Sequence, residues 1–147
     1  MINRYLTTIA WLGRLPAPDM NLFVRVWVAI VFFSSSRTKV DGGFLSLSDS
    51  AKMLFEYEYQ VPFLSADVAA TMALYLETFS PILLIVGLAS RLSAIPLLVM
   101  TAVIQLFVYP GSWTDHIMWA IALIFIILRG PGIISIDHLI RRQYDKS

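Results

Sequence analysis

ADVAATMALYLETFSPILLIVGLA, residues 66–89, decides the fold of this chain. After Asp67 the stretch carries one charge, Glu77, near its middle. An apolar run of this length predicts a membrane-spanning helix. An acidic side chain at that depth costs about 2.5–3.5 kcal/mol on insertion scales, so it is expected to face a partner group or a watery cavity. Glu77 is therefore the first candidate functional residue.

The composition of the whole chain also indicates a membrane protein. Of its 147 residues, 58% are hydrophobic and 14% are charged, whereas soluble domains carry about 25% charged residues. The net charge of +1 gives no indication of nucleic-acid binding. Cysteine is absent, which excludes disulfides, thiol redox chemistry and thiolate metal sites within this chain. Any redox role must then use a bound cofactor or a partner protein.

Four apolar segments predict transmembrane helices at about residues 20–36, 66–89, 93–109 and 112–129. The connections between the last three segments are too short for anything except antiparallel hairpins. We therefore expect an all-α integral membrane protein, with a single antiparallel four-helix bundle as the one domain of residues 1–147.

Two further segments predict helices at the membrane interface. The apolar residues of the N-terminal segment fall on one helical face, which predicts an amphipathic helix before Pro16. The segment Leu45–Leu64 predicts a short helix, capped by Ser48 or Ser50, that ends before Pro62. Its aromatic side chains fit an interfacial position. We interpret it as a lid on one end of the bundle, with a binding element as the alternative.

Basic residues orient the predicted bundle. The positive-inside rule places the more basic side in the cytoplasm, and here that side holds both termini. The side with the termini carries seven basic residues and the other side three: Arg4, Arg14, Arg91, Arg129, Arg141, Arg142 and Lys146 against Arg37, Lys39 and Lys52.

Three polar side chains on three predicted spans lie at similar depth. At about 1.5 Å per residue, Glu77, Gln105 and His116 each lie roughly 18–20 Å from the cytoplasmic end of their helix. Because such groups turn toward the bundle interior, we expect them to form an outward-opening pocket, with Tyr109 and Trp113 at its rim. In the alternative, Gln105 bonds a neighbouring helix and His116 lies among lipid headgroups.

Arg25 is the other charge within a predicted span. It lies about 10 Å closer to the cytoplasm than Glu77 on the same helical rise. A direct ion pair between Arg25 and Glu77 and an Arg25 side chain that reaches the headgroups both fit this position. The two histidines, His116 and His138, fall on opposite sides of the membrane, so we expect no metal site in this chain alone.

Three groups of residues carry a recognisable pattern: Arg25 and Lys39; Glu77, Gly87, Leu88, Arg91 and Ala94; and Gly130, Pro131, Gly132, Ser135 and Asp137. In this order and spacing they resemble the DoxX family of small four-helix membrane proteins. The likeness extends from Leu22 to Leu139. The chain departs from the family at Ser34–Ser36, where glycines are usual.

The resemblance implies a membrane protein of bacterial or archaeal type, often linked to redox systems. Together with the basic residues, it leads us to expect a multi-pass protein of the bacterial cytoplasmic (inner) membrane, with both termini cytoplasmic. We expect structural roles for the charged residues Arg25, Lys39, Arg91 and Asp137. Asp137 is expected either to cap the segment His138–Arg142 or to pair with Arg91.

Three functions fit these features. The first is an accessory or anchor subunit of a membrane redox assembly, with a quinone head group in the polar pocket and Glu77 or His116 taking the proton. Glu77 is then the candidate catalytic residue, although we do not expect an enzyme on its own or a covalent cofactor. The expected partners are the lipid bilayer and either a second protein or a second copy. The alternative is a non-enzymatic membrane scaffold that docks a partner, and the third reading is a small proton-coupled carrier.

Overall fold

The computed structural model describes residues 20–145, and the predicted N-terminal amphipathic helix lies outside this range. Within it the fold is all-α, as the sequence predicts, apart from one isolated bridge between Val40 and Leu47. Two of the elements, η1 and η2, are π-helical turns. The elements are α2 (Met20–Arg37), α3 (Asp49–Leu54), η1 (Phe55–Tyr59), α4 (Ala66–Val86), α5 (Ser90–Val103), η2 (Ile104–Val108), α6 (Trp113–Arg129) and α7 (Ile136–Tyr144).

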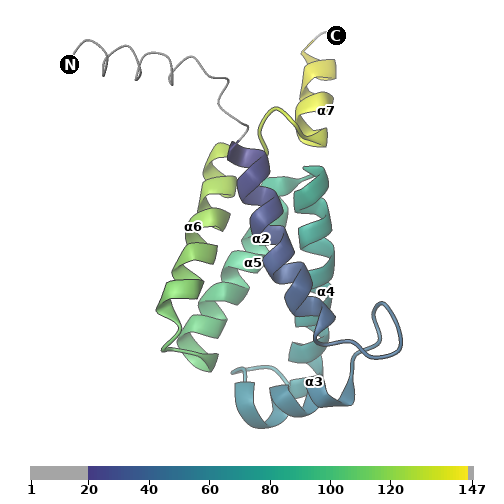
Figure 1. Cartoon of the computed structure of the whole chain (residues 1–147), viewed down its shortest axis with the longest axis vertical. Helices are drawn as coiled ribbons and strands as arrows, with labels where there is room; N and C mark the ends of the chain where they lie inside the picture. The colour runs from purple at the N-terminus through teal and green to yellow at the C-terminus, as the bar shows by residue number, and fades with distance from the viewer. Residues whose placement is uncertain (1–19, 146–147) are drawn as a thin grey trace, which may run out of the picture.

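The four longest helices lie alongside one another (Figure 1). α2 and α5 each pack against both α4 and α6. The contacts use small side chains, and Ala29 of α2, Ala70 of α4 and Ala94 of α5 are fully buried. Small residues let helix backbones approach closely, which is how helices associate without a hydrophobic drive between them.

Two helical segments in the described part of the chain are long and apolar enough to cross a membrane, Ala66–Val86 and Ser90–Val108. The criterion is length and composition alone. α2 has 18 residues and includes Arg25 and Arg37, and α6 has 17 residues. Both lie at the short end of the range for a spanning helix.

Local signals in the sequence set the ends of the helices. Ser48 caps α3, because its side chain accepts a hydrogen bond from the backbone N–H of Ala51. α3 continues through η1 and ends at Gln60, before Pro62, as the sequence predicts. α4 ends at Gly87, whose φ of 72° is the left-handed conformation that glycine adopts without strain.

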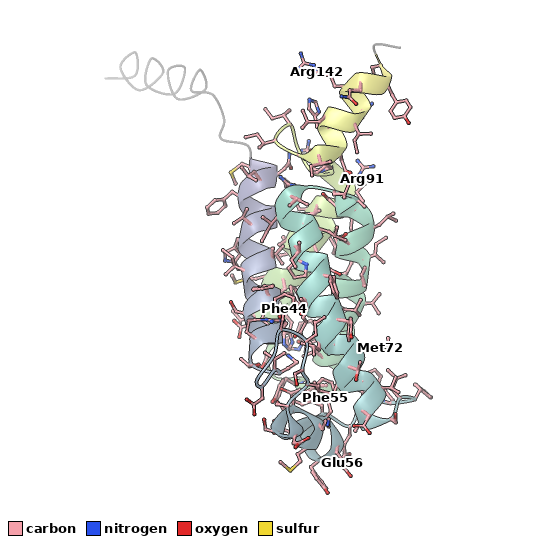
Figure 2. The ribbon with its side chains drawn as sticks, turned by 90° about the vertical axis from the view of Figure 1, so that its right-hand side faces the viewer. Phe44, Phe55, Glu56, Met72, Arg91 and Arg142 are labelled. Carbon is pink, nitrogen blue, oxygen red and sulfur yellow. The ribbon has the colours of Figure 1, made fainter. Side chains whose placement is uncertain are left out.

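The two ends of the helix array differ in their charge and packing. Figure 2 shows Arg91 and Arg142 at the end that carries α7, and Phe55 and Glu56 at the opposite end, which carries α3. Near the α7 end the four helices enclose an apolar cluster that includes Phe32, Leu84, Leu97, Leu123 and Ile126.

At the α3 end, α3 and η1 pack against α4 and form a cover for the helix array. Phe55 of η1 is buried against Ala69, Ala70 and Ala73 of α4. The small side chains of α4 leave room for this ring. The prediction that residues 45–64 fold over one end of the helices is therefore confirmed.

Candidate functional site

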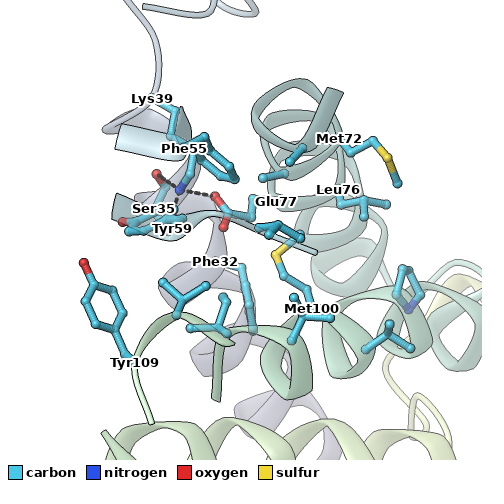
Figure 3. A pocket seen from close by; sticks show the side chains of 18 of the residues that line it. Phe32, Ser35, Lys39, Phe55, Tyr59, Met72, Leu76, Glu77, Met100 and Tyr109 are labelled. Carbon is cyan, nitrogen blue, oxygen red and sulfur yellow. Dashed lines mark hydrogen bonds and ion pairs between the residues drawn. The ribbon is translucent and has the colours of Figure 1, made fainter. Parts of the chain in front are cut away.

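A buried ion pair between Lys39 and Glu77 is the main polar feature near the α3 end. The Lys39 Nζ atom lies 2.7 Å from Glu77 Oε2, and the two residues are 7% and 3% exposed. Lys39 also donates to Ser35 Oγ at 2.9 Å and to the Ser35 carbonyl at 3.2 Å. Figure 3 shows the ammonium group between Ser35 and Glu77. A buried carboxylate is stable only when it is paired and hydrogen-bonded, and Lys39 meets that need.

Arg25 does not pair with Glu77, and it does not reach outside the helix array either. It is fully buried and donates to the carbonyls of Leu84 at 3.1 Å and Ile134 at 2.6 Å. Both expectations for Arg25 are therefore wrong. The physical reason is direction: side chains on a helix lean toward its N-terminus, so Arg25 leans toward the α7 end, away from Glu77.

A cavity of about 630 Å³ lies beside the ion pair. Its wall is mostly apolar, and Glu77 and Lys39 contribute the charged groups. Elements far apart in the sequence meet around it: α2, η1, α4, α5, η2 and α6 all supply side chains. Among them are Phe32, Phe55, Tyr59, Met100, Tyr109 and Trp119.

His116 borders the same cavity, and Gln105 lies behind it. His116 Nδ1 is 2.6 Å from Gln105 Oε1, and Gln105 Nε2 donates to the Pro110 carbonyl at 2.8 Å. His116 is 4% exposed, so it does not extend into a headgroup region. Gln105 does bond a neighbouring helix, as one of the two hypotheses for it predicted. Its partner on that helix, α6, is His116.

The five residues expected to form one binding pocket thus divide into three sets. Glu77, His116 and Tyr109 border the cavity. Gln105 positions His116 without bordering the cavity, and Trp113 is 61% exposed on the outside. Ligand binding by any of these residues remains a prediction.

The cover at the α3 end is joined to η2 by side chains. The Tyr109 hydroxyl donates to the Glu58 carboxylate, and the rings of Tyr59 and Tyr109 meet edge to face, with their centroids 5.6 Å apart. The bond to Glu58 is the main cause that raises the pKa of Tyr109 above its ordinary value. Because Phe55 and Tyr59 also border the cavity, η1 is both a lid and part of the wall.

Asp137 has a different role from the two that were expected. Its carboxylate accepts from the backbone N–H groups of Ala89 at 2.8 Å and Ser90 at 3.1 Å, at the start of α5. Ser135 caps α7 instead. The backbone N–H of Asp137 donates to the Gly87 carbonyl at 3.0 Å. Because Gly87 lies just before α5, this bond holds Asp137 next to the start of that helix. The first N–H groups of a helix favour a carboxylate.

Arg91 likewise has no ion pair with Asp137. Its guanidinium reaches toward the Leu128 carbonyl at 3.5 Å, beside Gly130 at the end of α6. Arg91, Arg25 and Asp137 together tie the ends of α4, α5 and α6 to the segment before α7. Within residues 20–145 no group of three or more metal-ligating side chains is placed to hold an ion.

Sequence reasoning did not identify Lys39 as the partner of Glu77, nor Phe55, Tyr59 and Trp119 as cavity residues. The paired occurrence of an acid and a lysine in the family pattern was the available signal for Lys39. No local signal marks the aromatic residues, because their meeting depends on how η1 and α6 approach.

Comparison with known proteins found a family match and a distant relative. The DoxX family model matches residues 20–110. The chain is also similar to an uncharacterized protein of Haemophilus influenzae, with 26% identity over 133 residues and 84% of each chain covered. No solved structure matches.

Proposed function

This chain belongs to the DoxX family of membrane proteins, and we propose that it binds a quinone in the cavity beside Lys39 and Glu77. In this proposal it is an accessory or anchor subunit of a membrane redox assembly. Electrons come from a partner protein in this proposal, since a chain without cysteine needs a bound cofactor or a partner for any redox step. The observation that carries the proposal is a mostly apolar cavity whose wall holds a buried ion pair.

In the same proposal, α2, α4, α5 with η2, and α6 all cross the bacterial inner membrane as a four-helix bundle. The large apolar side chains that these helices expose to the outside support this placement, since soluble proteins rarely expose so large an apolar surface. The basic residues around α7 support cytoplasmic termini. The exposed apolar residues include Phe23, Ile30, Phe79, Ile82, Ile85, Leu92, Val99, Phe107, Ile117, Ile121, Ile124 and Leu128.

The cavity has the chemical character that a quinone head group requires. Ligand pockets are mostly apolar with a few placed polar groups, and here the placed polar groups are the Lys39–Glu77 pair and His116. Phe32, Tyr59 and Met100 offer apolar surface to a flat ring. A bound quinone would supply two-electron, two-proton carrier chemistry. The chain would bind the head group, exclude water and hold Glu77 near it as a group that passes protons to the ring oxygens when the partner's electrons arrive.

A non-enzymatic scaffold is the second candidate, and one observation favours it. Glu77 is already paired with Lys39, as expected for a charge that only holds helices together. The size of the adjoining cavity favours the quinone proposal over it. The small carrier ranks third, because Leu84, Leu97, Leu123 and Ile126 form an apolar cluster between the cavity and the α7 end.

The test is a pull-down of the full-length protein in mild detergent, with co-purified lipids and proteins identified by mass spectrometry. Wild type, Glu77→Gln and the control Glu56→Gln, at an exposed position of η1, are compared. We expect quinone and a redox protein with wild type and with the control, and loss of the quinone alone with Glu77→Gln. Partners without quinone in all three samples would support the scaffold and contradict the quinone proposal.

A further inference from the structure

We propose that His116 presents a hydrogen-bond acceptor, the lone pair of Nε2, to the cavity. The cavity therefore selects a ligand with a hydroxyl donor, of the hydroquinone class, over the matching quinone. This inference rests on the proposed function, and it names the redox form that the site holds.

The first step is the orientation of the Gln105 amide. A backbone carbonyl only accepts hydrogen bonds, so the Gln105 atom that lies 2.8 Å from the Pro110 oxygen must be the amide nitrogen. The amide oxygen is then the atom that faces His116 Nδ1 at 2.6 Å. Two acceptors cannot bond each other, so His116 Nδ1 carries the hydrogen.

The second step concerns the other ring nitrogen. A neutral imidazole with its hydrogen on Nδ1 has a lone pair and no hydrogen on Nε2. Within residues 20–145, Nε2 of His116 has no hydrogen-bond partner, and it is not among the side-chain atoms sealed inside the protein. His116 is one of the residues that line the cavity, and the proposal directs this lone pair to a ligand there.

The third step is the form of the ring. His116 is buried and packs on Trp119, with ring centroids 5.0 Å apart. In the described part of the chain no carboxylate forms an ion pair with it. The neighbouring Glu77 carboxylate is already paired with Lys39. In the neutral ring Nε2 is an acceptor, whereas in an imidazolium it would be a donor, and the ¹⁵N spectrum described below distinguishes the two forms.

The cavity consequently offers an acceptor at His116 and a second acceptor at the Glu77 carboxylate, while the three ammonium hydrogens of Lys39 are already bonded to Ser35 and Glu77. A hydroquinone has two hydroxyl groups, each able to donate and to accept, so it satisfies both positions. A quinone has only acceptors and would set a carbonyl oxygen against the Nε2 lone pair. An unmade hydrogen bond of this kind corresponds to at least about a tenfold difference in affinity.

The first experiment compares three probes that share one decyl tail: a 1,4-hydroquinone kept under anaerobic conditions, its quinone and its 1,4-dimethyl ether. Full-length protein in lipid nanodiscs is titrated, and quenching of tryptophan fluorescence reports binding. Trp119 borders the cavity, so Trp119→Phe controls for signal from elsewhere. We expect the hydroquinone to bind at least about tenfold more tightly than the ether or the quinone.

Two variants test whether His116 causes this preference. His116→Phe keeps a flat ring and should lower the preference for the hydroquinone by about tenfold, because one of the two acceptors is lost. Gln105→Glu places a carboxylate against Nδ1 and favours the imidazolium, so the preference should shift toward the quinone. In a His138→Gln background His116 is the one histidine left, and its ¹⁵N spectrum in the free wild-type cavity should show the Nδ1–H form.

The outcomes separate the two proposals. If no probe binds, the proposed function is wrong as well as this inference. If wild type binds the hydroquinone and the quinone equally, or if the ¹⁵N spectrum shows hydrogen on Nε2, the quinone site stands and the role of His116 is overturned. The wild-type comparison and the spectrum keep this test valid even where a variant fails to fold.

Discussion

Lys39 and Glu77, 38 positions apart in the chain, form an ion pair with Nζ and Oε2 2.7 Å apart. Lys39 follows the end of α2, and Glu77 lies in the middle of α4. Because the two helices pack together, the pair fixes their alignment next to the cavity. The same two side chains therefore bear on stability and on the proposed quinone binding, and the predictions below separate these roles.

Removal of one partner should cost more than removal of both. Lys39→Met leaves the Glu77 carboxylate buried without its ammonium, so we expect a loss of about 3–5 kcal/mol in the free energy of unfolding. The double variant Lys39→Met/Glu77→Leu should be much more stable than Lys39→Met alone, since it leaves no buried charge. SDS titration in mixed micelles measures both values.

A matched control for that prediction is Lys52→Met. Lys52 and Asp49 form an ion pair of 3.0 Å, but their side chains are 43% and 91% exposed, so its loss should cost no more than about 1 kcal/mol. If Lys39→Met were as mild as Lys52→Met, the buried pair would not be a stabilising contact of the helix array.

Gly87 should not accept a side chain. Its φ is 72°, and a Cβ would collide with the Arg25 guanidinium and lie 2.5 Å from the Ser135 Cβ. We expect Gly87→Ala to lower the free energy of unfolding by about 2–4 kcal/mol through backbone strain and overpacking. Gly111→Ala is the control, because a Cβ there meets nothing within 4 Å. Equal Tm values for the two variants would contradict this close approach.

Asp137 should stabilise the start of α5. Asp137→Ala removes the acceptor for two backbone N–H groups, at Ala89 and Ser90, and should cost about 1–2 kcal/mol. Asp145→Ala, at an exposed position with a 4.0 Å contact to Arg141, should have almost no effect. In Asp137→Ala, hydrogen exchange should increase at the first turn of α5. An increase spread evenly over the chain would argue against a capping role.

Tyr109 should hold the lid in a pH-dependent way. The phenol donates to Glu58, so deprotonation destroys the bond, and the raised pKa of Tyr109 means that folding favours the protonated form. This stabilisation is complete below the ordinary tyrosine pKa and is lost as pH rises through the higher value of the folded protein. Hydrogen exchange of residues 55–59, compared between wild type and Tyr109→Phe at each pH, measures it.

The difference in hydrogen exchange of residues 55–59 between wild type and Tyr109→Phe should be constant from pH 7 to about 9. It should disappear only in more alkaline solution, above the ordinary tyrosine pKa. The Tyr75→Phe control lies on α4, outside the lid, and should match wild type throughout. A constant difference at every pH would mean that the hydroxyl is not the relevant group.

The sequence was sufficient for the elements of the fold that depend on local pattern. Apolar length predicts α4 and the α5–η2 segment, and the span expected at residues 112–129 matches α6. Of the two caps expected for α3, Ser48 and Ser50, the structure has Ser48. These features depend on residues close together in the chain, for which composition and spacing carry the information.

The side-chain partners could not be predicted in the same way. The depth estimate placed Arg25 within conceivable reach of Glu77, but depth ignores the direction in which a side chain leaves its helix. Lys39 was expected beyond the end of the first span, and it turns back to α4 because Ser35 and Glu77 together satisfy its ammonium group. The choice between two cations for one carboxylate depends on helix rotation, which spacing alone leaves open.

The chain departs from the DoxX family pattern at Ser34–Ser36, where glycines are usual, and the structure gives a physical reason for this departure. Ser35 accepts from Lys39 through both its hydroxyl and its carbonyl, and Ser36 is fully buried with its hydroxyl bonded to the Phe33 carbonyl. Serine is small enough for close helix packing, and it adds a polar contact that glycine lacks. Helix contact is thus kept, and the ammonium gains a partner.

The most direct test of the quinone site is photo-crosslinking of full-length protein in nanodiscs with an azido-quinone, followed by peptide mapping. Wild type is compared with Ala73→Phe, which fills the cavity, and with Ala102→Phe, at an exposed position of α5 outside the cavity wall. We predict that label falls on peptides containing Phe32 or Met100, that unlabelled quinone competes for it, and that only Ala73→Phe abolishes it. Label confined to outward-facing residues, or unchanged in Ala73→Phe, would contradict a quinone site beside Lys39 and Glu77.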